Sequence, residues 1–226
     1  VPGSMVVRGF LTRAMPYQPV KDFSPITLAA LSVGSISVPA GGAASLKDLI
    51  EGSKGGSRKA NFATNGVGSS DHLTGELINR LSNAGLVHVP YKGQGPAVQA
   101  AVAGEVDAYI GVLSGSLPMI QAGKLRVVAY TNVRPPVGDD PKVPLIRDVV
   151  PGFNNPLYWV GYFGPAKLPA PVLRRLNAEY VKWLTSPEFK PKFEAQYNPV
   201  VANTPEEFTA ILNADLERVA KIVKAA

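Results

Sequence analysis

The chain has 226 residues, of which 46% are hydrophobic and 18% charged, and its net charge is +6. These totals indicate a globular protein of one or two lobes that is long enough to bury a core. The absence of cysteine excludes disulfides and thiolate metal sites, and the basic residues are too scattered to favour a nucleic-acid partner.

Short apolar runs rich in valine, isoleucine and tyrosine predict five buried strands. They lie around residue 36 and at 59–64, 86–91, 106–112 and 125–131. Helical patterns separate them: one begins after Ser45, one covers 71–84 and ends at Gly85, and one runs from Pro96 to Ala103. The alternation of strands and helices predicts a mostly parallel sheet with helices on both faces.

The remainder of the chain is proline-rich after residue 131 and almost entirely helical from Pro171 onward. The last helix opens with "TPEEF", in which Thr204 and Glu207 form a capping box around Pro205. Its buried stripe is predicted to consist of Phe208, Ile211, Leu212, Leu216, Val219 and Val223. The middle of the chain is therefore a complete α/β lobe by its pattern, whereas the two ends have too few strands to form a second lobe alone.

Two glycine-rich loops are each expected to lead from the carboxyl end of a strand into a helix. The first is "TNGVGSSDH" from Thr64, and the second is "VPYKGQGP", in which Tyr91 ends the strand. Helix N-termini at that edge of a sheet carry unpaired N–H groups and bind anions. The alternative is that Ser69 or Ser70 merely caps its helix, and the charge of Asp71 would oppose a nearby anion.

Catalytic and cofactor sites have less support in the sequence. Ser69 and His72 are close, but a hydrolase would need a third member and a nucleophile elbow, which are missing. His88 alternates within a strand and is interpreted as a packed core residue. No metal site or cofactor is predicted, because the two histidines lack an acid cluster and no dinucleotide or phosphate-loop fingerprint occurs.

Five segments resemble one family in order along the chain, from about Met15 to the C-terminus. They are "MPYQPVKDFSPITLAA", "NFATNGVGSSDHLTGELI", "VHVPYKGQGPAVQAAVAGEVDAYIG", "AGKLRVVAYT" and "YWVGYFGPAKLPAPVLRRLNAE". They closely resemble the Bug proteins, the extracytoplasmic solute receptors of tripartite tricarboxylate transporters. The resemblance implies a non-enzymatic periplasmic binding protein of type II topology, with two lobes joined by crossover strands. Lobe 1 would comprise 1–36 and 157–226, and lobe 2 would comprise 37–156.

The resemblance also implies a ligand and the residues that bind it. The ligand would be a small carboxylate: a di- or tricarboxylate, an acidic amino acid or an aromatic acid, delivered to membrane subunits of the transporter. The binding residues carried over are Thr64, Gly66, Gly68, Ser69, Ser70 and His72 of the first loop, Tyr91, Lys92, Gly93 and Gly95 of the second, and Trp159 with Gly161 at the lobe crossover. Trp159 is expected either to face the cleft as an aromatic plate or to plug the lobe interface.

Two departures from the family pattern modify this expectation. Gly111 stands where the family usually has an acid, which argues against recognition of an amino group. The first strand and glycine-rich loop of lobe 1 are missing from this chain, so lobe 1 is expected to be incomplete. The sequence then predicts weak or absent ligand binding, with the uncovered apolar surface either belonging to a longer protein or covered by self-association. A truncated non-binding paralogue that acts as an interaction module remains an alternative, and a hydrolase using Ser69 and His72 is a weaker one.

Overall fold

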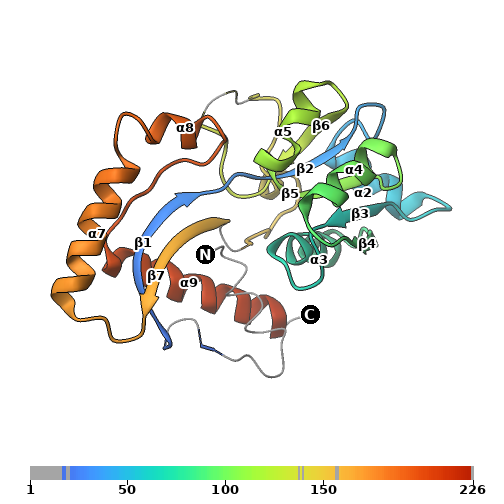
Figure 1. Cartoon of the computed structure of the whole chain (residues 1–226). Helices are drawn as coiled ribbons and strands as arrows, with labels where there is room; N and C mark the ends of the chain where they lie inside the picture. The colour runs from blue at the N-terminus through green and yellow to red at the C-terminus, as the bar shows by residue number, and fades with distance from the viewer. Residues whose placement is uncertain (1–16, 19–20, 137, 139, 156–157, 225–226) are drawn as a thin grey trace. The chain divides into compact units, whose positions relative to one another are not determined.

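The structure is a computed structural model that describes residues 17–18, 21–136, 138, 140–155 and 158–224. The described residues form two compact units (Figure 1). The central unit comprises the described residues within 33–134 and 138–155, and the flanking unit comprises those within 17–32, 135–136 and 158–224. The expected start of lobe 1 at residue 1, the start of the resembling segments at Met15 and the side chain of Val223 lie outside the described residues.

The central unit contains a five-stranded sheet in the order β4-β3-β5-β2-β6. Its strands are β2 (Gly34–Pro39), β3 (Asn61–Thr64), β4 (Val87–Pro90), β5 (Ala108–Val112) and β6 (Leu125–Tyr130). Each predicted strand is present. β3 is parallel to β4 and β5, whereas β2 is antiparallel to both of its neighbours, β5 and β6. The prediction of a mostly parallel sheet is therefore wrong for β2, because strand–helix alternation does not reveal which strand is inserted in reverse between two others.

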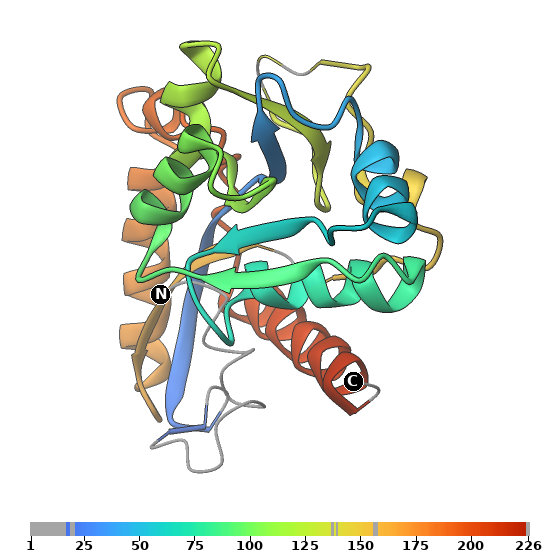
Figure 2. The ribbon, with the colours of Figure 1, turned by 90° about the vertical axis from the view of Figure 1, so that its right-hand side faces the viewer.

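The helices of the central unit are α2 (Leu46–Gly55), α3 (Ser70–Ser82), α4 (Gln94–Ala103), α5 (Leu113–Gln121) and α6 (Ile146–Val149). Figure 2 shows α3 and α4 on opposite sides of β3 and β4. On the α3 side, Gly75 lies against the ring of Phe62 so closely that a Cβ on Gly75 would overlap it. On the other side, Ala97 of α4 packs in one apolar cluster with Ala63 and Tyr109. Helices on both faces of the sheet are thereby confirmed for this unit.

The ends of these helices agree with the sequence to within a few residues. Ser45 caps α2, and its Oγ accepts a hydrogen bond from the Asp48 amide at 3.1 Å. α3 ends at Ser82, because Asn83 already has the left-handed conformation, with φ 54°. α4 begins before Pro96, with Gly93 as its N-cap residue. Neither α5 nor α6 was predicted.

The flanking unit is built on an antiparallel pair of strands, β1 (Phe23–Leu31) and β7 (Trp159–Pro165). Three helices follow: α7 (Ala170–Leu184), α8 (Lys190–Glu194) and α9 (Pro205–Lys224). The capping box of α9 is confirmed, since the Thr204 amide donates to Glu207 at 2.9 Å and the Glu207 amide donates to Thr204 Oγ1 at 3.2 Å. Phe208, Leu212 and Val219 are buried as predicted.

None of the described helices combines the length and the apolar character that crossing a bilayer demands.

Candidate functional site

The two glycine-rich loops lie side by side in the central unit. The first loop, 64–70, follows β3, and the second loop, 91–95, follows β4, which is the parallel neighbour of β3. The Tyr91 amide donates a hydrogen bond to the Thr64 carbonyl at 3.0 Å. A Cβ placed on Gly66 would lie 3.4 Å from the Tyr91 carbonyl oxygen. The two loops therefore leave the sheet next to each other, at the carboxyl ends of β3 and β4.

The first loop is held by its own hydroxyl groups. Thr64 Oγ1 accepts a hydrogen bond from the Gly66 amide at 3.1 Å. Gly66 has φ 128° and Gly68 has φ 75°, conformations that residues with a Cβ rarely adopt. Ser69 Oγ accepts from the His72 amide at 3.1 Å and donates to the Gly66 carbonyl at 2.8 Å. Ser69 thus caps α3 and closes the turn at the same time.

This geometry does not support the hydrolase alternative. The Ser69 hydroxyl proton is directed at the Gly66 carbonyl and not at an imidazole. His72 Nδ1 accepts from the Gly68 amide at 3.4 Å, and its Nε2 lies 3.8 Å from Glu76 Oε1. A serine nucleophile needs a base within hydrogen-bond reach of its hydroxyl, and His72 is occupied elsewhere.

The two histidines, although far apart in sequence, stack against each other beneath the first loop. The ring centroids of His72 and His88 are 4.1 Å apart, and His88 also stacks on Phe62 at 5.1 Å. His88 Nε2 lies 2.7 Å from Thr64 Oγ1 and the residue is only partly buried, so its interpretation as a packed core residue is not confirmed. Burial lowers the pKa of His88 to about 4, and the neighbouring His72 adds to the shift.

The pKa of His72 is also lowered by burial, and the nearby Glu76 opposes that shift. Both imidazoles are consequently neutral near pH 7 and add no positive charge to the loop. Among the described residues there is no group of three histidine, cysteine or acidic side chains that could hold a metal ion.

The second loop leaves the start of α4 without a side-chain cap. Gly93 is the N-cap residue, with φ 114°, and it offers no side-chain hydrogen bond. Lys92 and Gly95 are exposed. Gln94, which sequence reasoning passed over, donates from Nε2 to the Val112 carbonyl at 2.9 Å and so ties the loop to the end of β5. The sequence signal that could have identified Gln94 is its position between two glycines, where the helix begins.

Ser70 and Asp71 begin α3 and are both buried. The Ser70 carbonyl accepts from Thr74 Oγ1 at 2.9 Å, and Thr74 in turn accepts from Asn155 Nδ2 at 2.6 Å. The first turn of α3 is therefore anchored in the interior of the central unit. α4 has no acidic residue in its first turn, whereas α3 has Asp71. The N-terminus of α4 is therefore the more favourable of the two for an anion.

Trp159 does not present a ring face to a ligand in this structure, and the expectation of an aromatic plate is wrong. The residue is 2% exposed. Its Nε1 donates to Asp215 Oδ2 at 2.7 Å, and its ring packs edge-on against Phe208 at a centroid distance of 5.3 Å. Gly161 is required for the same packing, since a Cβ there would overlap the Phe208 ring. A buried indole with its N–H hydrogen-bonded packs as core.

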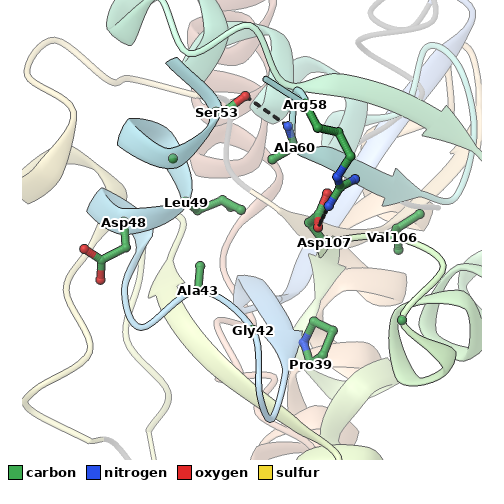
Figure 3. A pocket seen from close by; sticks show the side chains of 12 residues that line it. Pro39, Gly42, Ala43, Asp48, Leu49, Ser53, Arg58, Ala60, Val106 and Asp107 are labelled. Atoms are coloured by element: carbon green, nitrogen blue, oxygen red, sulfur yellow. Dashed lines mark hydrogen bonds and ion pairs between the residues drawn. The ribbon is translucent and has the colours of Figure 1, made fainter. Parts of the chain in front are cut away.

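A pocket of about 270 Å³ lies at the opposite end of the central sheet, before β3 and β5 begin (Figure 3). Arg58 and Asp107 point toward each other there and form an ion pair at 2.5 Å. Asp107 also exchanges hydrogen bonds with Asn61, accepting from its amide and donating its own amide to Asn61 Oδ1, both at 2.8 Å. These charged groups already satisfy one another, so the pocket is a weaker ligand candidate than the two loops.

Comparisons with known proteins agree with this architecture. A relative from Pseudomonas sp. (strain P51), the UPF0065 protein in the tcbD-tcbE intergenic region, is 33% identical over 223 residues, covering 97% of this chain and 66% of the relative. A solved structure of a periplasmic transporter is 31% identical, with a TM-score of 0.88, covering 99% of this chain and 75% of the other. The R. palustris protein Rpa4515 with adipate is 27% identical, with a TM-score of 0.82, covering 94% and 72%.

The fold is thus the α/β fold of a periplasmic binding protein, although the chain spans less than the full length of the proteins it matches. Residues 1–226 match the family described as "Tripartite tricarboxylate transporter family receptor". The chain belongs to this family of receptors.

Proposed function

We propose that this protein is a periplasmic solute receptor that binds a small carboxylate at the first and second loops of the central unit. It would deliver that ligand to membrane subunits of a tripartite tricarboxylate-type transporter. The observation that carries the proposal is the pair of glycine-rich loops joined by the 3.0 Å hydrogen bond from Tyr91 to Thr64. Each loop leads directly into a helix N-terminus.

A carboxylate is the group that such a site accepts best. Each helix N-terminus carries unpaired N–H groups and about half a positive charge. A charge-assisted hydrogen bond to a carboxylate contributes about 1.5–3 kcal/mol, so a few of them suffice for micromolar affinity when the loops are already in place. The site needs no cofactor for this task.

The two helix ends would not share the anion equally. Asp71 places a carboxylate in the first turn of α3, whereas the first turn of α4 contains no acid and its N-cap residue is a glycine. The α4 end would therefore take the larger part of the ligand charge. The hydroxyls of the first loop would serve mainly to hold the backbone of that loop in shape.

The ligand class is supported by the relatives. A family structure 27% identical to this chain was solved with adipate, a dicarboxylate. The periplasmic location is supported by the likeness to a solved periplasmic transporter.

Calorimetric titration with adipate, malate and citrate tests the proposal. We expect micromolar binding of at least one of them by the unmodified chain, in place of the weak or absent binding that the sequence predicts, because both loops lie in the central unit and follow paired strands. Ser69→Ala should weaken that binding about tenfold or more, because it releases the turn that Ser69 closes on Gly66. The matched control is Ser45→Ala, which removes the equivalent cap from α2 and should cost a similar ~1 kcal/mol of stability without affecting affinity.

Two results would contradict the proposal. One is the absence of binding heat with all three acids, as expected for a non-binding interaction module. The other is an equal loss of affinity in the Ser69 and Ser45 variants, which would mean that general destabilisation and not the first loop is responsible. Measurement of the mass in the same buffer tests the separate expectation of self-association.

A further inference from the structure

Asn65 in the first loop is followed by Gly66, and the two form the only Asn–Gly pair in the sequence. In such a pair the backbone nitrogen of the glycine can attack the side-chain amide carbon of the asparagine, because glycine has no Cβ to hinder the approach. Asparagine is among the thermolabile residues of proteins. The pair therefore marks a place where the chain can change chemically without an enzyme.

The structure exposes the Asn65 side chain and places it outside the regular elements. Asn65 is exposed and lies in the turn between β3 and α3. Asn61 and Asn79, in the flanking elements, are by contrast held by hydrogen bonds of 2.7–2.8 Å to backbone groups. Asn65 is thus the asparagine of this region whose amide is accessible to both the neighbouring nitrogen and water.

One contact restrains the attacking nitrogen. The Gly66 amide donates a hydrogen bond to Thr64 Oγ1 at 3.1 Å, and this N–H must lose both its partner and its proton before the nitrogen can attack. Gly66 has φ 128°, in a region that glycine occupies without strain. Loops open locally at low cost in free energy. The Thr64 hydroxyl therefore slows the attack and does not prevent it.

The reaction is balanced with water as its only co-reactant. The Gly66 nitrogen forms a bond to Cγ of Asn65, and the side-chain nitrogen leaves as ammonia with the proton that Gly66 has lost. The product is a five-membered succinimide ring. Water then opens this ring at either of its two carbonyls. One opening gives aspartate, and the other gives isoaspartate, in which the main chain continues through the former side-chain carbon.

Either product adds a carboxylate to a loop that we propose as part of the ligand site. Asp71 already places one acid in the first turn of α3, and a second acid in the same loop repels a bound carboxylate further. Isoaspartate also lengthens the main chain by one carbon. That extra carbon disturbs the turn in which Ser69 Oγ donates to the Gly66 carbonyl at 2.8 Å.

We propose that Asn65 is a modification site, at which deamidation converts the first loop into a form that binds carboxylates weakly. The loss of affinity rests on the proposed function, whereas the chemical change at Asn65 does not. The rate rises with pH, because the Gly66 amide must lose its proton. The fraction of converted protein then increases with the age of the molecule and with the alkalinity of its surroundings.

The first experiment measures the conversion. The unmodified chain is incubated at pH 6 and at pH 8 in heavy-oxygen water, which labels the acid formed then and distinguishes it from conversion during digestion. Peptide mass spectrometry follows Asn65, with Asn83 and Asn213 as controls in the same sample, since both are exposed and precede alanine. We expect Asn65 to convert at least about tenfold faster than either control, because alanine carries a Cβ. Conversion should be faster at pH 8, and faster again in Thr64→Val.

The second experiment measures the consequence. The converted protein is separated from the fresh protein by ion exchange, and both are titrated calorimetrically with adipate, malate and citrate. We expect the converted protein and the variant Asn65→Asp to bind about tenfold more weakly than fresh protein, owing to repulsion between the two negative charges. The melting temperature of Asn65→Asp should be unchanged, because the position is exposed. The control variant Asn65→Gln should keep its own initial affinity throughout the incubation, because glutamine closes the corresponding ring far more slowly.

The possible results separate this inference from the proposed function. If Asn65 converts no faster than Asn83 and Asn213, the inference is wrong and the proposed function stands. If Asn65 converts but the converted protein binds as tightly as the fresh protein, the inference is also wrong. If the fresh protein binds none of the acids, the proposed function fails and the loss of affinity falls with it, while the mass measurement still decides whether Asn65 is modified.

Discussion

Replacing His88 by phenylalanine should reduce the loss of stability that the protein undergoes between pH 6.5 and pH 4. The His88 pKa is lowered from an ordinary 6.5 to about 4, first by burial and then by His72. A folded-state pKa below the unfolded one means that the unfolded chain binds more protons in that interval. The contribution of His88 to stability is therefore complete above pH 6.5 and is lost as the pH falls toward 4.

The magnitude follows from the size of the shift. Lowering the pKa from 6.5 to about 4 corresponds to about 3.4 kcal/mol at 1.36 kcal/mol per pH unit. The His88 ring is only partly buried, and solvent screening reduces such effects, so we expect about 1–2 kcal/mol. Phenylalanine retains a ring that can stack between Phe62 and His72, which keeps the packing contribution similar.

The assay is urea unfolding followed by tryptophan fluorescence at pH 7, 6, 5 and 4 in both proteins. Carboxylates also titrate in this range, but the unmodified protein and His88→Phe contain the same carboxylates. Their contribution therefore cancels in the difference between the two unfolding free energies. The chain has two histidines, so the double variant His72→Phe/His88→Phe removes every imidazole and sets the baseline. Parallel curves of unfolding free energy against pH for the unmodified chain and His88→Phe would refute the reasoning.

Further outcomes follow from single contacts. Gly75→Ala should lower the unfolding free energy by about 1–3 kcal/mol, because the new Cβ overlaps the Phe62 ring. In urea titrations, the double variant Gly75→Ala/Phe62→Leu should recover part of that free energy. Trp159→Phe should cost about 1–3 kcal/mol by depriving buried Asp215 of the indole N–H, while affinity for adipate stays unchanged in calorimetry. Thr204→Ala removes the capping box of α9 and should cost about 1 kcal/mol, measured in the same way.

The strands of the central unit and the caps of α2 and α9 could be predicted because their signals are local. Apolar β-branched runs between glycines mark strands, and Ser45 and Thr204 mark helix starts by spacing alone. The direction of β2 could not be predicted in this way, because tertiary packing determines that it pairs with β5 and β6. α5 was missed because it begins at Leu113 directly after β5, without an intervening turn, and contains Pro118.

The candidate site was predictable only in part for the same reason. Its two loops belong to successive strand–helix units, so their proximity follows from the order of the sheet. The stack of His72 on His88 joins different elements and has no sequence periodicity to reveal it. The error on Trp159 had a visible warning: Asp215 interrupts the apolar stripe of α9 at a position that points inward.

The ring stack below the first loop divides the loop into positions that can vary and positions that cannot. Thr64 and Ser69 are hydrogen-bonded into the turn above the histidines, whereas Asn65 is exposed and Val67 is 69% exposed. Substitutions at 65 and 67 should therefore have little effect on folding, although both positions belong to the loop that we propose as part of the ligand site. A combinatorial library restricted to these two positions should yield mostly folded variants, and ligand preference can evolve there while the scaffold beneath stays unchanged.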